Sequence, residues 1–243
     1  MAIRAVVFDA VGTLFHSSRS ISEVYATVGR EFGAQVEATE IARRFTPAYF
    51  RHFGRPQPGD SPASTVTSEE LERNRWRQVV SDVFEELPHA GGELFERLWD
   101  HFAQGAAWQL FPDVRTTWDE LTRRGYRLAI GSNYDRRLLS VLRDLPPLND
   151  CEWVFHSAGV GHSKPGVQFF RHVEQATGLL PEELLFVGDD WNNDYLGATH
   201  AGWSALWLDQ KPTGTSPPRP ESASRRVTCL AEVVEWLVST QTT

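Results

Sequence analysis

The chain has 243 residues, of which 41% are hydrophobic and 23% charged, an ordinary composition for a folded protein. Its formal net charge of −8 argues against a nucleic-acid binder or an anionic-membrane binder, since both usually need a basic surface. Cys151 and Cys229 cannot build a zinc-type site or disulfide framework and no stretch could span a bilayer, so we expect a soluble cytoplasmic protein.

The first predicted element is a short strand over residues 3–8. These residues are mostly apolar and β-branched, and the run ends directly at Asp9. A continuous apolar run of this length is typical of a strand that is buried on both faces.

The next segment, from about residue 20 to 105, favours helices only. Amphipathic patterns cover residues 22–32, 39–52, 68–84 and 92–102. A Pro/Gly/Ser-rich loop separates the second pattern from the third. We therefore expect an all-helical cap over residues 18–109, inserted into an α/β core of residues 1–17 and 110–243. Most of its aromatic residues should form its own core, and the remainder should line a crevice.

Strands and helices alternate in the second half of the chain. Further apolar runs occupy residues 127–131, 152–155, 184–187 and 204–208. Helical patterns occupy residues 114–124, 135–143, 167–177 and 194–200. This alternation predicts an α/β fold with a parallel sheet and right-handed crossovers. A polar, proline-rich loop over residues 209–225 and a closing helix over residues 231–239 complete the predicted elements.

Polar side chains follow four of the predicted strands or the loops after them. They are Asp9 with Thr13, Ser132 with Asn133, Lys164, and the group Asp189, Asp190 and Asp194. Ligands of open α/β sheets bind beyond the carboxyl ends of the strands. A single Asp or Ser there is usually a helix cap or turn residue, but all four clusters together indicate one site.

The chemistry of these residue types is coherent. A carboxylate such as that of Asp9 can attack phosphorus or carbon and form a covalent ester. Mg²⁺ binds carboxylate oxygens and would offset the negative charge, with Asp189 and Asp194 as further partners. Lys164 would act as a point charge. Thr13 or Ser132, with backbone N–H groups around Asn133, would hold phosphoryl oxygens. We therefore expect a small phosphorylated or otherwise anionic substrate.

These motifs resemble those of the haloacid dehalogenase superfamily. FDAVGTLF is similar to its first motif, GSN to its second, KP to its third and VGDDWNND to its fourth. The resemblance implies a Rossmann-like core with an inserted cap. It also implies Asp9 as nucleophile and metal ligand, the Val11 backbone carbonyl and Asp189 as metal ligands, and Asp194 as a supporting carboxylate. The stretch SNYDRRL resembles the subgroup around haloacid dehalogenase-like hydrolase domain-containing protein 3.

Val11 departs from the pattern of the superfamily's phosphatases. They carry at this position a second Asp that serves as general acid and base, which Val11 cannot replace. Loss of a general acid typically lowers the rate by about 10²–10⁴-fold. Substrates with good leaving groups, such as acyl phosphates, would avoid this loss. His16 and His162 are candidate substitute acids.

Two further interpretations remain open. The first motif also resembles that of metal-independent 2-haloacid dehalogenases, in which a halide leaves without a proton. Such an enzyme uses a cap arginine, for which Arg75 and Arg77 are the candidates. Alternatively, the chain could be a catalytically weak metal-binding or interaction module. Five polar or charged groups at one crevice argue against that reading, because they need a ligand to satisfy them.

Overall fold

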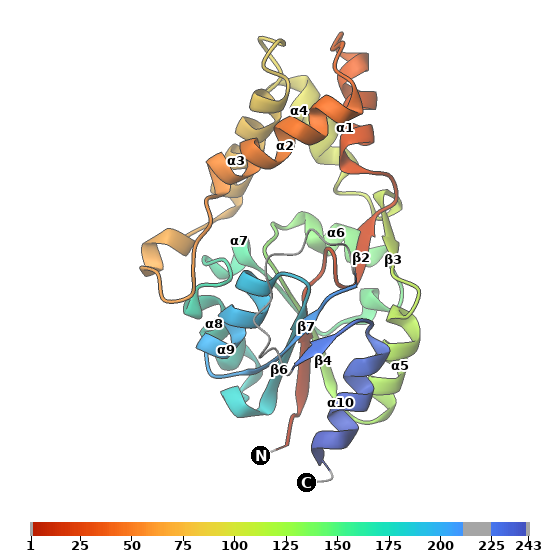
Figure 1. Ribbon diagram of the computed structural model, residues 1–243, viewed down its shortest axis with the longest axis vertical. Coiled ribbons are helices and arrows are strands. Elements are labelled where there is room, and N and C mark those ends of the chain that lie inside the picture. The colour runs from red at the N-terminus through yellow and green to blue at the C-terminus, as the bar shows by residue number, and fades with distance from the viewer. Residues whose placement is uncertain (1, 211–224, 242–243) are drawn as a thin grey trace.

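The protein consists of a helical layer stacked on one end of a parallel sheet. A computed structural model describes residues 2–210 and 225–241, and Figure 1 shows the two layers one above the other. Most of the predicted loop at 209–225 lies outside the described residues. Among the described residues, none of the helices has the length and hydrophobicity that a membrane span needs.

Six strands form the sheet, in the order β5, β4, β1, β6, β7, β8, and all neighbours are parallel. They are β1 (Ala5–Phe8), β4 (Arg127–Ser132), β5 (Trp153–His156), β6 (Leu184–Gly188), β7 (Ser204–Leu208) and β8 (Arg226–Val227). This confirms the predicted parallel α/β class, with β8 as an unpredicted edge strand. The two-residue length of β8 is too short to show an apolar pattern.

Hydrophobic side chains cover both faces of the sheet. Val6 and Phe8 of β1 point into one hydrophobic cluster, whereas Ala5 and Val7 point into another. Helices α5 (Val114–Arg123), α6 (Arg137–Arg143) and α10 (Ala231–Gln241) pack on the first face, and α8 (Val167–Thr177) and α9 (Gly197–His200) on the second. Burial on both sides explains why the strands are continuous apolar runs rather than alternating ones.

The helical layer contains α1 (Ile21–Glu31), α2 (Ala38–Phe53), α3 (Glu69–Val83) and α4 (Glu93–His101). All four match predicted helical patterns to within a residue or two. Ser20 and Glu23 form a capping box at the start of α1, and the Ser68 hydroxyl accepts a hydrogen bond at the start of α3. The layer has its own hydrophobic cluster, which includes Ile41 and Val79.

A two-stranded antiparallel ribbon joins the layers. It consists of β2 (Phe15–Ser17) and β3 (Trp108–Leu110), which pair through Phe15 and Leu110 at one end. The sequence did not predict these strands, because three residues are too few to show a period of two. We propose that the cap begins and ends at this ribbon, close to the expected divisions after residues 17 and 109.

A loop of the helical layer also reaches down to the core. We call residues 62–67, which include the short helix η1 (Pro62–Thr65), the strap. The Thr67 backbone N–H donates to the Gly161 carbonyl at 3.0 Å, and the Ser163 N–H donates to the Thr65 carbonyl at 2.8 Å. The strap therefore pairs with the segment that leads into Lys164, just after α7 (Ser157–Val160).

Candidate active site

The site is centred on Lys164, whose ammonium lies between two carboxylates. Its Nζ is 2.7 Å from Asp9 Oδ1 and 2.6 Å from Asp194 Oδ1. Asp9 follows β1 at the centre of the sheet, and Asp194 lies in the π-helical turn η5 (Trp191–Leu196) after the neighbouring strand β6. Asp9 and Lys164, 155 positions apart in sequence, thus meet at the carboxyl end of the sheet.

Burial and ion pairing act on Lys164 in opposite directions. The side chain is only 1% exposed, and such burial alone would lower the pKa of its ammonium. The negative charges of Asp194 and Asp9 more than offset this and raise the pKa. Lys164 is therefore a permanent cation in the site and cannot serve as a base near neutral pH.

Thr13 holds Asp189 in place. The Thr13 hydroxyl donates to Asp189 Oδ1 at 3.1 Å and accepts a hydrogen bond from the Asp189 backbone N–H at 3.1 Å. Thr13 is fully buried, and its two hydrogen bonds restrain the position of Asp189. Gly12, which precedes Thr13, has φ +92°, and a Cβ there would lie 2.4 Å from Asp189 Oδ2. Only glycine allows this close approach.

Asp190 caps the turn that follows β6, and Asp194 lies within it. The Asp190 carboxylate accepts hydrogen bonds from the backbone N–H groups of Asn192 and Asn193, both at 2.8 Å, and so caps η5. Asp194 Oδ2 accepts from the Asp190 backbone N–H, while Oδ1 pairs with Lys164. A Cβ on Gly188 would lie 2.2 Å from this carboxylate, so the end of β6 needs glycine. The side chain of Asp190 supports the turn rather than the crevice.

The acidic residues leave a negative charge that the site does not balance. Asp9, Asp189 and Asp194 each offer an oxygen within 4.8 Å of the others. Lys164 is the cation that pairs with this cluster, so two negative charges remain when all three carboxylates ionise. Asp189 makes no salt bridge within the described residues, and although part of the residue is exposed to solvent, protein atoms crowd around its carboxylate. Burial among protein atoms and the charge of Asp9 raise its pKa to about 7. A dication would offset this charge, so the donor set fits a hard divalent metal.

Ser132 and Asn133 at the end of β4 differ in their contacts. The Asn133 side chain donates to the Lys164 carbonyl at 2.9 Å and accepts from its N–H at 2.8 Å. It therefore fixes the backbone of Lys164. The Ser132 hydroxyl has no hydrogen-bond partner within the described part of the chain. It is free to donate to a substrate oxygen.

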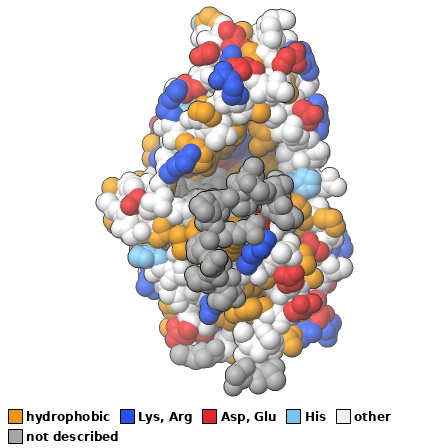
Figure 2. Space-filling model, in the orientation of Figure 1, with side chains coloured by type: hydrophobic (Ala, Val, Ile, Leu, Met, Phe, Trp, Pro, Cys, Tyr) orange, Lys and Arg blue, Asp and Glu red, His pale blue; other side chains and the backbone are white. Residues whose placement is uncertain are grey.

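Val11, two residues beyond Asp9, lies in the wall of a cavity of about 300 Å³ between the layers. The carboxylates of the acidic cluster and Lys164 are not part of this wall. The wall combines Asn133 and Tyr134 from the core with residues of α1 to α4, including Tyr49 and Trp76. In the space-filling view, apolar side chains gather in the recess between the two layers (Figure 2).

Comparison with known proteins decides the family. A model of haloacid dehalogenase-like hydrolases matches residues 3–202, most of the chain. The chain belongs to this family. Haloacid dehalogenase-like hydrolase domain-containing protein 3 of Homo sapiens is 29% identical over 206 residues, which span 83% of this chain and 80% of that protein. The expected resemblance to the subgroup around this protein is thereby confirmed.

Other relatives of this haloacid dehalogenase-like hydrolase differ in chemistry. Glyceraldehyde 3-phosphate phosphatase of Methanothermobacter thermautotrophicus is 30% identical over 134 residues, 55% of this chain and 59% of that protein. The structure of 2-haloacid dehalogenase from Pseudomonas syringae pv. Tomato DC3000 superposes with a TM-score of 0.61 at 19% identity, covering 98% of this chain and 99% of that one. The fold thus accommodates both reactions and does not choose between them.

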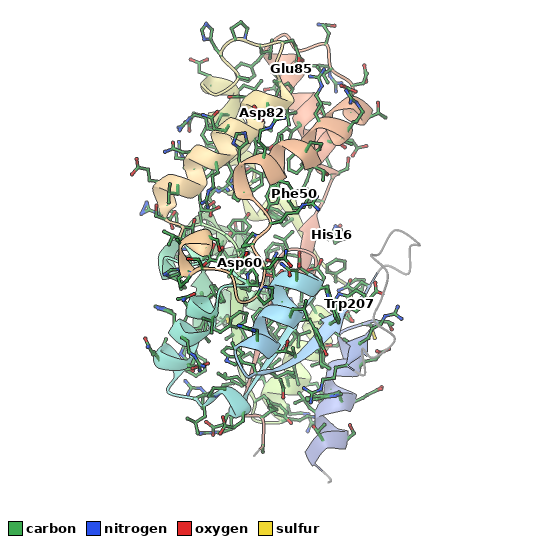
Figure 3. The ribbon with its side chains drawn as sticks, turned by 60° about the vertical axis from the view of Figure 1, so that its left-hand side comes forward. His16, Phe50, Asp60, Asp82, Glu85 and Trp207 are labelled. Carbon is green, nitrogen blue, oxygen red and sulfur yellow. The ribbon has the colours of Figure 1, made fainter. Side chains whose placement is uncertain are left out.

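The proposed substitute acids and cap arginines lie outside the cavity wall of this hydrolase. His16 sits at the junction of the layers, with its Nδ1 2.9 Å from the Ser17 carbonyl oxygen (Figure 3). His162 contacts the Thr65 hydroxyl at 3.3 Å. Arg75 pairs with Glu72 inside the helical layer, and Arg77 bonds Asn74. None of these four residues lines the cavity.

Sequence reasoning missed a polar pair in the cavity wall. Arg137 donates to both oxygens of Asp135, at 2.8 and 2.7 Å, and its guanidinium stacks 3.4 Å from the Trp99 ring. Asp135 and Arg137 belong to the core, whereas Trp99 lies in α4, so this contact joins the layers. From the sequence, Asp135 and Arg137 could not be distinguished from the ordinary charged residues of a helix start. Their buried salt bridge and its contact with Trp99 are visible only in the structure.

Proposed function

We propose that the chain is a magnesium-dependent hydrolase that moves a phosphoryl group from a small metabolite to Asp9 and then to water. The observation that carries the proposal is the acidic cluster beside Lys164, with two negative charges that a dication would offset. A metal-independent dehalogenase has no need of Asp189 in this position. The named relative that is a phosphatase supports phosphoryl chemistry as well.

Asp9 is suited to nucleophilic attack. Lys164 holds Oδ1, which fixes the carboxylate and leaves the second oxygen for phosphorus. As the Asp9 O–P bond forms, the bond from phosphorus to the leaving oxygen breaks. Water then attacks phosphorus, and inorganic phosphate departs with the hydrogen atoms of that water. This step restores the Asp9 carboxylate.

The remaining residues bind and orient. Asp9, Asp189 and the Val11 backbone carbonyl would hold Mg²⁺, which when bound would neutralise phosphoryl charge. The Ser132 hydroxyl would donate to a phosphoryl oxygen, and Thr13, Asn133 and Asp194 would keep the acidic residues and Lys164 in position. Of the residues expected to bind the phosphoryl group, only Ser132 is thus proposed to contact it with its side chain.

The leaving group must depart without a proton from Val11. The candidate histidines have other partners and do not line the cavity. A carboxylate leaving group needs no proton, so acyl phosphates should be better substrates than alkyl monoesters. Phosphotransfer to an acceptor other than water would use the same first step.

The test assays the purified chain against acyl phosphates, alkyl phosphates and 2-chloropropionate, each with Mg²⁺ and with chelator. We expect phosphate release that depends on Mg²⁺, is greatest for acyl phosphates and is abolished in Asp9→Asn. Asp150→Asn, on an exposed turn, is the matched control for loss of one carboxylate. Chloride release that persists in chelator would replace the proposal with dehalogenation, and inactivity on every compound would favour a binding module.

A further inference from the structure

The cavity above the acidic cluster is built mainly from aromatic rings. Nine of its sixteen lining residues are Phe, Tyr or Trp, and they come from both layers. Trp76 and Tyr49 belong to the helical layer, whereas Trp108 and Tyr134 come from β3 and the core. A volume of about 300 Å³ falls at the lower end of the range for small-molecule sites.

The cavity offers a ligand no unpaired charge. Its charged lining residues, Asp135 and Arg137, neutralise each other in a two-bond salt bridge. The Tyr134 hydroxyl donates to the Phe102 carbonyl at 3.4 Å. Burial raises the pKa of Tyr49 to about 12, so its hydroxyl is neutral. A charged group placed here would lose its water without an opposite charge to compensate it.

Val11 places the wall of this cavity close to Asp9 in the chain. It lines the cavity and lies two residues beyond Asp9, on the loop that also contains Thr13. Asn133, which fixes the backbone of Lys164, lines the cavity too. An organic group attached to the phosphoryl group at Asp9 would therefore extend past Val11 into the aromatic walls.

Resting on the function proposed above, we infer that the organic part of the substrate is uncharged, apolar and about the size of an aromatic ring. Flat apolar groups pack well against ring faces and edges. Val11 then serves as part of an apolar wall as well as lacking acid function.

The experiment compares benzoyl phosphate with acetyl phosphate at saturating Mg²⁺. Both release a carboxylate, so neither needs a general acid, and they differ mainly in the ring. We expect kcat/KM to be about 100-fold higher for benzoyl phosphate, with most of the difference in KM. Phenylphosphonate and methylphosphonate, which cannot be hydrolysed in this way, give the same comparison as binding constants measured by calorimetry.

Two matched variants assign the preference to the cavity. Ile21 lines the cavity and is 37% exposed, whereas Leu71 is 41% exposed and does not line it. Each residue lies in the first turn of a cap helix, where an Asp is well tolerated. Ile21→Asp should reduce the benzoyl preference about tenfold or more, and Leu71→Asp should keep the wild-type ratio.

The outcomes separate this inference from the proposed function. Equal kcat/KM for the two acyl phosphates, or an unchanged ratio in Ile21→Asp, would overturn the inference while the hydrolase function stands. Turnover of neither compound, combined with tighter binding of phenylphosphonate, would uphold the apolar site and overturn the proposed function. Equal binding of both phosphonates without turnover would overturn both.

Discussion

Thr13 and Asp189 exchange two hydrogen bonds across 176 positions of sequence, and this exchange fixes an acidic residue at the solvent side of the site. One bond involves the carboxylate and the other the backbone N–H, each at 3.1 Å. The geometry locks both the loop that follows β1 and the loop that follows β6. Thr13 thereby connects the segment that carries Asp9 to Asp189, the expected metal ligand.

The variant Thr13→Val should weaken Mg²⁺ binding. Valine keeps the shape but removes both hydrogen bonds, and loss of a contact that orients a metal ligand typically costs about 10–100-fold in affinity or activity. Calorimetric titration with Mg²⁺ and the Mg²⁺ dependence of phosphate release measure the effect. Thr13→Ser retains the hydroxyl and should stay close to wild type. Unchanged Mg²⁺ affinity in the valine variant would contradict the role assigned to Thr13.

Ser132→Ala should lose activity without losing stability. The hydroxyl has no partner within the described residues, so its removal leaves no group unsatisfied. Removal of one donor to a transition-state oxygen costs roughly 10²–10³-fold in kcat. Urea unfolding should show a change below about 1 kcal/mol. A variant that is equally active, or that is strongly destabilised, would argue for a structural role instead.

Val11→Asp should increase hydrolysis of alkyl phosphates. A carboxyl group at this position could protonate the leaving oxygen, an effect typically worth about 10²–10⁴-fold. Acyl phosphates should gain little, because their leaving group needs no proton. Val11→Asn, of nearly the same shape but unable to give up a proton, is the control. If the folded, Mg²⁺-bound Asp variant shows no gain, another group already supplies the proton.

Glu72 of α3 provides a pH-dependent contribution to stability. Burial raises the pKa of Glu72 above its ordinary 4.5, although hydrogen bonds from Thr67 and Arg75 favour the charged form. The folded protein therefore holds the Glu72 proton more tightly than the unfolded chain does. Below pH 4.5 Glu72 is protonated in both the folded and the unfolded state, so its burial does not lower the free energy of unfolding. That free energy falls as pH rises through the raised pKa.

Glu72→Gln should remove this loss. The free energy of unfolding of wild type, measured by urea between pH 4 and 8, should fall more steeply with pH than that of the variant. At pH 7 the variant should therefore be the more stable of the two. Glu70→Gln, on the exposed side of the same helix, controls for loss of a charge. Parallel curves for wild type and Glu72→Gln would show that burial does not perturb this residue.

The sequence predicted what depends on local pattern. Strand β1 is an apolar run followed by Asp9, and parallel strands bring such ends together, so the approach of Asp9, Lys164 and Asp194 followed from order alone. The cap helices were predictable because their period of 3.6 extends over nine residues or more. The roles of the individual site residues stay predictions.

What the sequence could not show depends on partners that are distant in the chain. Asn133 resembles a free polar group at a strand end, but both atoms of its amide bind the backbone of Lys164. The cavity is lined by aromatic residues of both layers. A helical pattern alone cannot distinguish a ring that lines this cavity from one that packs in the hydrophobic core of the helical layer. The helix predicted from residue 194 starts three residues earlier as a π-helical turn, which turns Asp194 back toward Lys164.

The strap connects the helical layer to the segment that positions the Lys164 ammonium at the centre of the site. Its backbone pairs with residues 161 and 163, just before Lys164, and the Lys164 side chain forms ion pairs with Asp9 and Asp194. A displacement that admitted a bulky ligand by lifting the strap would break those backbone hydrogen bonds and loosen the segment that carries the ammonium. The helical layer, which carries the strap, therefore helps to hold the Lys164 charge in place, in addition to forming part of the cavity wall.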